Sequence, residues 1–161
     1  MGKKVSKMIG SFSEKTGCVL QSGGDGVIEV KTPFCLAGGS PLRFCIEERD
    51  SGTLRMTDNG DVLFHLASRG IDTSGPSAWY KATQIVSAFG IQISYTGEII
   101  GSGRAANLED LAIRYLNALL AVAAFGCSQL GEIEQPAEEC WQGENWLRGT
   151  PLEELQVAQS R

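Results

Sequence analysis

Glu29 and Lys31 flank Val30 in a short β-prone segment, and this pair is the strongest catalytic candidate in the sequence. In metal-dependent nucleases, an E-x-K pattern supplies a carboxylate that holds Mg²⁺ and a lysine that steadies the attacked phosphate. The upstream aspartate is missing, because Asp25 lies too close and in a predicted turn, and Glu14 is the substitute. Strands also commonly expose charged side chains around an apolar one. We therefore predict a structural role for the pair and keep a nuclease, or a nuclease subunit, as the alternative function.

A second polar cluster contains Asp58, Asn59, Asp61 and His65, the one histidine of the chain. His65 lies one helical turn beyond Asp61, and an aspartate–histidine pair could act as a general base. Turn and capping chemistry explains the same residues separately, with Asp58-Asn59-Gly60 as a turn that needs positive φ, Asp61 as a helix N-cap and His65 on the helix surface. We predict no catalytic residue here, and we assign Asp58 and Asn59 to a binding surface.

The sequence gives no support for a metal site or a cofactor. The cysteines form no C-x-x-C pair, and one histidine is too few for the usual zinc ligand sets, so we predict reduced thiols in a cytoplasmic protein. The segment Gly101–Arg104 precedes a predicted helix but lacks a P-loop lysine or a dinucleotide fingerprint, so we predict a flexible helix entry there. The five cysteines are Cys18, Cys35, Cys45, Cys127 and Cys140.

The net charge of −5 is concentrated at the C-terminal end. Residues 128–161 hold seven of the 19 acidic residues and two of the 14 basic ones, which leaves twelve of each sign in residues 1–127. Apart from the lysines of residues 3–7, the chain has no lysine and arginine cluster of the kind that binds a phosphate backbone. Direct nucleic-acid binding is therefore disfavoured, and a protein partner with a basic surface is expected.

Two of the three tryptophans lie in this acidic C-terminal segment. Tryptophan is enriched at binding hot spots, where a rigid aromatic ring fills a desolvated pocket. Packing of both rings onto the domain itself is the alternative, because large aromatics also bury well within a chain. We predict that the segment binds a partner, which could be a second copy of the chain, through Trp141, Trp146, Glu138, Glu139 and Glu144.

Apolar periodicity and turn residues predict an α+β fold. A meander of three to four antiparallel strands and a later hairpin form the sheet, which about four helices cover, and an acidic extension follows. The predicted helices run from Val5 to before Gly17, from the Asp61 cap to Ala67, from Pro76 to Phe89, and from the Asn107 cap to Phe125, with Gly126 after the end. The predicted strands are Cys18–Leu20, Val27–Val30 (ended by Thr32-Pro33-Phe34), Leu42–Glu47, Thr53–Thr57, Ile91–Tyr95 and Glu98–Ile100.

Domain organisation follows from where this periodicity stops. We predict one α+β domain over residues 1–130 and an acidic, tryptophan-containing extension over residues 131–161. The longest apolar run, residues 111–125, is shorter than the roughly 20 residues of a membrane span and is interrupted by Arg114 and Asn117. We therefore expect a buried helix there, no signal peptide and no membrane association.

An ordered series of short motifs resembles the bacterial and phage family known as domain of unknown function 1828. The resemblance covers about residues 27–120 and implies an α+β module of prokaryotes and mobile elements, with no established activity. The motifs are Thr32-Pro33-Phe34, Ile46 in a strand, Thr57-Asp58-Asn59-Gly60 with Leu63 and Leu66, Gly70-Ile71-Asp72, and Phe89-Gly90-Ile91.

Together these features favour binding over catalysis. We predict a non-enzymatic, protein-binding regulator, adaptor or inhibitor, encoded by a phage or mobile element and directed at a host protein such as a defence protein. The acidic segment and the family resemblance carry this prediction. The E-x-K pair carries the nuclease alternative.

Overall fold

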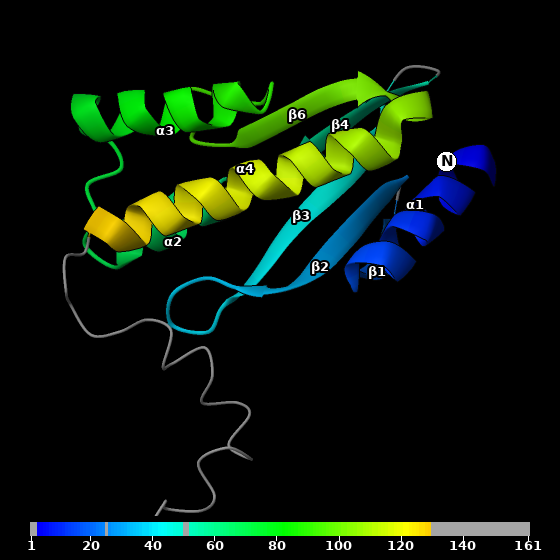
Figure 1. The fold of residues 1–161 in the computed structure, drawn as a ribbon, viewed down its shortest axis with the longest axis horizontal. Coiled ribbons are helices and arrows are strands. Elements are labelled where there is room, and N and C mark those ends of the chain that lie inside the picture. Colours follow the sequence, from blue (N-terminus) through cyan, green and yellow to red (C-terminus); the bar gives the residue numbers. More distant parts are fainter. Residues whose placement is uncertain (1–2, 25, 50–51, 130–161) are drawn as a thin grey trace, which may run out of the picture.

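The structure is a computed structural model that describes residues 3–24, 26–49 and 52–129. Along the chain, a first helix is followed by a β-meander, two helices, a β-hairpin and a long helix (Figure 1). The helices are α1 (Lys3–Thr16), α2 (Asp61–Ser68), α3 (Pro76–Ala88), α4 (Leu108–Gln129) and the 3-10 turn η1 (Ala105–Asn107). The strands are β1 (Val19–Gly24), β2 (Val27–Cys35), β3 (Pro41–Glu48), β4 (Thr53–Thr57), β5 (Gln92–Ile93) and β6 (Ile99–Arg104).

The six described strands form one sheet in the order β1-β2-β3-β4-β6-β5. Every neighbouring pair is antiparallel, and β4 joins the meander to the β5–β6 hairpin through the pairing of β4 with β6. The predicted α+β class is confirmed: an antiparallel meander and a hairpin are covered by four α-helices in the described ranges. The predicted C-terminal extension lies outside the described residues.

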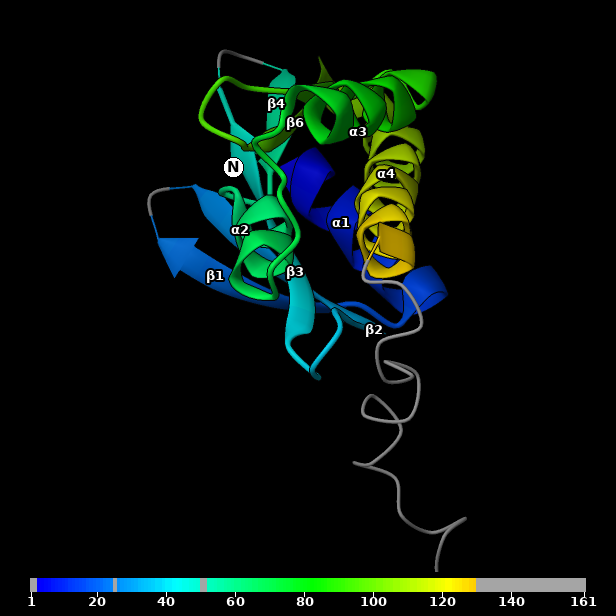
Figure 2. The same ribbon diagram turned by 90° about the vertical axis from the view of Figure 1, so that its left-hand side faces the viewer.

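Side-chain alternation divides the sheet into a covered face and an open face. On β3, Leu42, Phe44 and Ile46 are buried, whereas Arg43 is exposed and Glu47 is half-buried. Successive side chains of a strand point to opposite faces, so one face of the sheet receives the core and the other meets solvent. Figure 2 shows the sheet on the left with α3 and α4 on its right. The side away from these helices is the open face.

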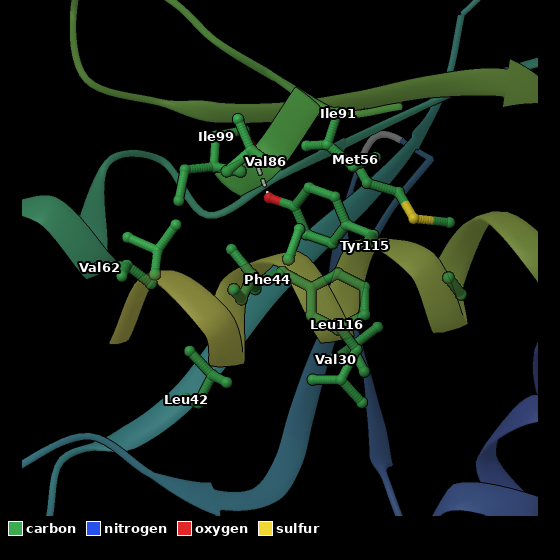
Figure 3. Close-up of a cluster of buried hydrophobic side chains, with 14 of the residues drawn as sticks. Val30, Leu42, Phe44, Met56, Val62, Val86, Ile91, Ile99, Tyr115 and Leu116 are labelled. Atoms are coloured by element: carbon green, nitrogen blue, oxygen red, sulfur yellow. Dashed lines mark hydrogen bonds between the residues drawn. The ribbon is translucent and has the colours of Figure 1, made fainter. Parts of the chain in front are cut away.

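The helix α4 is the centre of the core. Tyr115 is completely buried, and its ring centre lies 5.1 Å from that of Phe44 across the helix–sheet interface (Figure 3). Its hydroxyl donates a hydrogen bond of 2.6 Å to the carbonyl oxygen of Ile99, which satisfies the one polar group of this ring in an apolar surrounding. Other α4 side chains that are buried in the core are Leu108, Leu111, Ala112, Leu116, Ala118, Leu119 and Val122.

In the described ranges, one segment, Ala105–Ser128, has the length and hydropathy of a membrane-spanning helix. It is the core helix α4 with its preceding turn, and 44% of its most apolar window is buried inside the protein. One face of α4, which includes Leu111, Tyr115 and Leu119, lies in the core, whereas Ile113 is exposed. This fits the predicted buried helix.

Three of the predicted element boundaries that were wrong concern β2, β6 and α4. The strand β2 continues through Pro33 to Cys35, because the Thr32 hydroxyl donates 2.9 Å to the Leu42 carbonyl where the regular ladder is interrupted. The segment Gly101–Arg104 is not a flexible helix entry but part of β6, paired with β4.

The third concerns Gly126, which does not end α4 but lies inside it. A β-carbon at this position would lie 2.3 Å from Leu66 Cδ2, so glycine is needed where α2 crosses close to α4. Two glycines of β6 likewise allow side chains of α4 to approach the strand closely. A β-carbon on Gly101 would lie 2.9 Å from the Tyr115 ring, and one on Gly103 would lie 3.1 Å from Leu111. Loss of the side chain therefore allows helices to approach closely.

Candidate functional site

Asp58 holds together the point where β4, α2 and β6 meet. It is 2% exposed, and its carboxylate accepts backbone N–H bonds from Gly60 (3.0 Å), Val62 (3.0 Å) and Ile99 (2.8 Å). Burial raises the pKa of this carboxyl, and the three hydrogen bonds oppose the shift. A side chain enclosed in this way offers no surface to a partner, so the structure gives Asp58 a role in the fold in place of direct contact.

The same geometry corrects the predicted helix cap. Asp61 is the first residue of α2, and Gly60, with φ of 81°, occupies the N-cap position. The Asp58 carboxylate satisfies the Val62 amide, which a capping side chain would otherwise bind. An aspartate three residues before the expected cap can do this because the turn folds its carboxylate back under the helix start.

Asn59 is the exposed residue of this turn. Its φ is 54°, a left-handed conformation that asparagine tolerates better than most residues, which confirms the predicted positive φ. Its backbone N–H donates 3.0 Å to the Thr57 hydroxyl, and its side-chain Nδ2 lies 3.7 Å from Cys45 Sγ on the open face of the sheet. The predicted binding residue Asn59 therefore connects the turn to the open face.

Two exposed aromatic side chains lie beside this turn. Phe64 on α2 is 76% exposed, and Tyr95 in the β5–β6 turn is 96% exposed. The two segments adjoin, because a β-carbon on Gly60 would lie 3.8 Å from the Gly97 carbonyl oxygen and one on Gly97 would lie 3.9 Å from Leu63. We call Asn59, Asp61, Phe64 and Tyr95 the turn surface.

Sequence reasoning missed these two aromatics, although a signal was present for one of them. The buried stripe of α2 consists of Val62, Leu63 and Leu66, and Phe64 falls off this stripe at helical spacing. Tyr95 carried no such signal, since it lay in a segment that was predicted to be a strand and is in fact the tight turn between β5 and β6. Only the tertiary structure brings α2 and the β5–β6 turn together.

His65 is used to hold α2 against the rest of the fold. Its Nε2 lies 2.5 Å from the carbonyl oxygen of Ala37, which requires the proton on Nε2. The ring thereby ties α2 to the loop between β2 and β3. The predicted surface position is only partly right, because this side chain is half-buried.

Glu29 and Lys31 both lie on the open face, as their alternation around the buried Val30 requires. Glu29 pairs with Arg43 of the neighbouring strand at 3.4 Å. Among the residues that the structure describes, no three histidine, cysteine, aspartate or glutamate side chains are grouped so as to hold a metal ion. The structure thus provides an ionic partner for Glu29, and the nuclease alternative stays a prediction.

The remaining open face carries charges of both signs. Arg55 bridges Glu47 (3.4 Å) and Glu98 (2.5 Å), and Arg49 also reaches Glu47 at 2.5 Å. Partly exposed ion pairs of this kind contribute little to stability, so their main effect is on the pattern of surface charge. The Arg55–Glu98 pair borders the β5–β6 turn and so extends the open face to the turn surface.

Cys45 lies at the centre of the open face. The pKa of its thiol is raised, mainly by burial, and the contact with Asn59 opposes part of this shift. At pH 8 we expect iodoacetamide to alkylate Cys45 several-fold more slowly than the exposed Cys35, because the thiolate is the reacting form. Asn59→Ala removes the lowering contact and should slow Cys45 further without affecting Cys35. Mass spectrometry of the alkylated peptides measures both rates, and a faster Cys45 in the variant would contradict this assignment.

The predicted binding residues of the C-terminal segment, Trp141, Trp146, Glu138, Glu139 and Glu144, lie outside the described residues. Their role therefore stays a prediction.

The fold defines a class: an open-faced α+β domain whose antiparallel sheet has helices on one side and polar residues on the other. More specifically, the chain belongs to the family described as domain of unknown function DUF1828, whose family model matches residues 32–122. No curated protein and no solved structure matches the chain. The match covers more than half of the sequence and includes the Asp58 turn, α2, α3 and the hairpin. It begins within β2, so α1 and β1 lie outside it.

Proposed function

We propose that the protein is a non-enzymatic binding protein, a regulator, adaptor or inhibitor, that engages a partner protein with its turn surface. The observation that carries the proposal is the exposure of two aromatics, Phe64 on α2 and Tyr95 in the β5–β6 turn, on adjoining segments that buried hydrogen bonds of Asp58 connect. Aromatic rings supply large contact areas with few rotatable bonds, and they dominate the energetics of protein interfaces.

Preorganisation is the second physical support for this proposal. The free energy of association is reduced by the cost of ordering mobile loops. Asp58 links the turn to α2 and to β6 by backbone hydrogen bonds, so Asn59 and Phe64 keep their relative positions before a partner arrives. Asp61 precedes Phe64 by three residues, and Glu98, which pairs with Arg55, follows Tyr95 by three. Polar side chains near both aromatics are consistent with the polar rim that usually borders an aromatic hot spot.

The partner class follows from charge and from the family. The acidic segment after residue 128 favours a partner with a basic surface. The resemblance implies that the family occurs in bacteria and phages. This favours a phage or mobile-element product whose target is a cytoplasmic host protein, such as a defence protein. Trp141 and Trp146 would then supply a second contact with the partner, in addition to the turn surface.

The test is the double variant Phe64→Ala/Tyr95→Ala, with Tyr80→Ala as the matched control because Tyr80 is 62% exposed on α3. We expect the wild type and the control to retain the same proteins from a bacterial lysate, and the double variant to bind the purified partner at least tenfold more weakly. A hot-spot aromatic contributes roughly 2 kcal/mol or more, which is why tenfold is a lower bound. Unchanged affinity of the folded double variant would refute the proposal.

A truncation after residue 130 tests the C-terminal contact separately. Weaker binding by the truncated chain, with both aromatics of the turn surface intact, would support the predicted role of Trp141 and Trp146. Equal binding by both chains would remove the segment from the interface and leave the turn surface as the contact.

The alternative function is tested by incubating the protein with DNA and RNA in the presence of Mg²⁺ or Mn²⁺. Cleavage that disappears in Glu29→Ala but persists in Glu47→Ala, a carboxylate on the same face, would establish the nuclease in place of the binding protein. Cleavage by both variants would point to a contaminant.

A further inference from the structure

The strand β1 is an edge of the sheet with few of the usual protections. Five of its six residues are exposed, and in the described ranges only β2 pairs with it. Its sequence, Val-Leu-Gln-Ser-Gly-Gly, contains no lysine, no other charge and no proline. Proteins commonly block exposed edges with such residues, because free backbone N–H and C=O groups along an edge pair readily with another strand.

The opposite edge contrasts with β1. There β5 has two residues, which leaves little backbone to pair, and β5 ends at a tight turn stabilised by the Gly97 N–H to Ser94 carbonyl bond of 3.0 Å. Short edge strands are a common protection against pairing. On β1, the irregularity lies at the far end, between Ser22 and Gly24, and leaves the part before it regular.

The side chains of β1 complement themselves in one antiparallel register. If Gln21 lies opposite Gln21 of a second copy, Leu20 lies opposite Ser22 of that copy in the regular part of β1, and Val19 lies opposite Gly23 at the irregularity. The helices of both copies then stay on the same side of one continuous sheet. Val19 is 63% exposed on the open face. Gly23 has no side chain, and a β-carbon there would lie 3.5 Å from Val27 Cγ1, so Val19 would reach Val27 of the second copy across the glycine.

We propose that β1 is a self-association surface and that it joins two copies of this chain into an antiparallel, twofold-symmetric dimer with a continuous sheet. The twofold axis passes between the two Gln21 residues, whose amides each offer a donor and an acceptor to the other. Two Val19–Val27 contacts flank this pair. The absence of charge on β1 favours an identical strand over a charged peptide as the occupant. The dimer is independent of the proposed turn surface, which lies on other elements.

Disulfide trapping in the full chain tests the register. In Gln21→Cys, the paired α-carbons lie about 4.5–5.5 Å apart, within the range of a disulfide. In the matched control Ser22→Cys, the two cysteines are diagonal neighbours about 7–8 Å apart and are poorly placed. We expect mild oxidation to give a covalent dimer of Gln21→Cys at least tenfold faster than of Ser22→Cys or of the parent, which controls for the native cysteines. Equal rates in all three would overturn the proposal.

Light scattering during gel filtration tests the dimer without a new cysteine. The parent should have the mass of two 17.2 kDa chains and dissociate on dilution. Gln21→Lys places two ammonium groups opposite each other and should raise the dissociation constant at least tenfold, whereas Gln92→Lys, on the opposite edge, should not. Circular dichroism confirms that each variant is folded. A monomeric parent at every concentration, or equal effects of the two substitutions, would overturn the proposal.

Discussion

Replacing Asp58 with alanine is expected to lower the free energy of unfolding by about 4 kcal/mol, as each buried donor that loses its partner costs roughly 1–3 kcal/mol. The substitution leaves the amides of Gly60, Val62 and Ile99 without their acceptor in a buried site. It also removes the link between the start of α2 and β6. Denaturant unfolding followed by circular dichroism measures the change.

The control for this experiment is Asp61→Ala, three residues further on. Asp61 is exposed, and Asp58 already satisfies the Val62 amide at the helix start, so its loss should change the free energy of unfolding by less than about 1 kcal/mol. Similar losses in the two variants would show that the buried network is not the source of stability at this turn.

The pH dependence provides a second test of the same carboxyl. Burial raises the pKa of Asp58 in the folded state above the value near 3.8 that it has in the unfolded chain. Between these two pKa values the folded protein binds the proton more tightly, so stability falls as pH rises through this interval and levels off above it. Asp58→Asn cannot titrate and should lack this part of the slope. An unchanged slope in Asp58→Asn would contradict the assignment of the shift.

Gly126→Val is expected to lower the free energy of unfolding by about 3 kcal/mol, at the upper end of overpacking effects. A β-carbon at Gly126 already lies 2.3, 2.6 and 2.9 Å from three atoms of Leu66, which is buried between α2 and α4. The two helices must separate or Leu66 must leave its rotamer. Thermal and denaturant unfolding measure the loss.

The control is Ala124→Val, because Ala124 is exposed on the same helix. Propensity alone disfavours valine relative to alanine but favours it relative to glycine, so a larger loss in Gly126→Val than in Ala124→Val must come from packing. Leu66→Ala in the Gly126→Val background should restore part of the lost stability by removing the clashing atoms. A double-mutant cycle that is strictly additive would show that Leu66 is not the residue that requires glycine here.

Much of the fold was predictable because local patterns and global packing agree. The alternation of Leu42, Phe44 and Ile46 predicted the covered face of β3, and Gly90 stops α3 at the residue where periodicity ends. The errors arose where a contact distant in sequence replaced a local preference. Glycine is typical of a helix end, yet Gly126 lies inside α4 because Leu66 packs against it too closely for a side chain.

The candidate site was less predictable than the fold. The turn at Asn59-Gly60 and its positive φ follow from residue type alone. Whether an aspartate in that turn faces solvent or the core does not, because the answer depends on the Ile99 amide, 41 residues away. Asp58 was predicted to bind a partner and is instead enclosed, whereas Phe64 and Tyr95, which were not predicted, are exposed on the two adjoining segments, α2 and the β5–β6 turn.

The sequence by itself determined the α+β class, the family and the neutral body with its acidic C-terminal segment, because these depend on periodicity, motif order and composition. Only the tertiary structure decided which polar groups are buried and which aromatics remain outside. Burial depends on contacts between segments that are far apart in the chain, such as α2 with the β5–β6 turn. The surfaces on which the proposed functions rest, the turn surface and the free edge of β1, exist only once those contacts form.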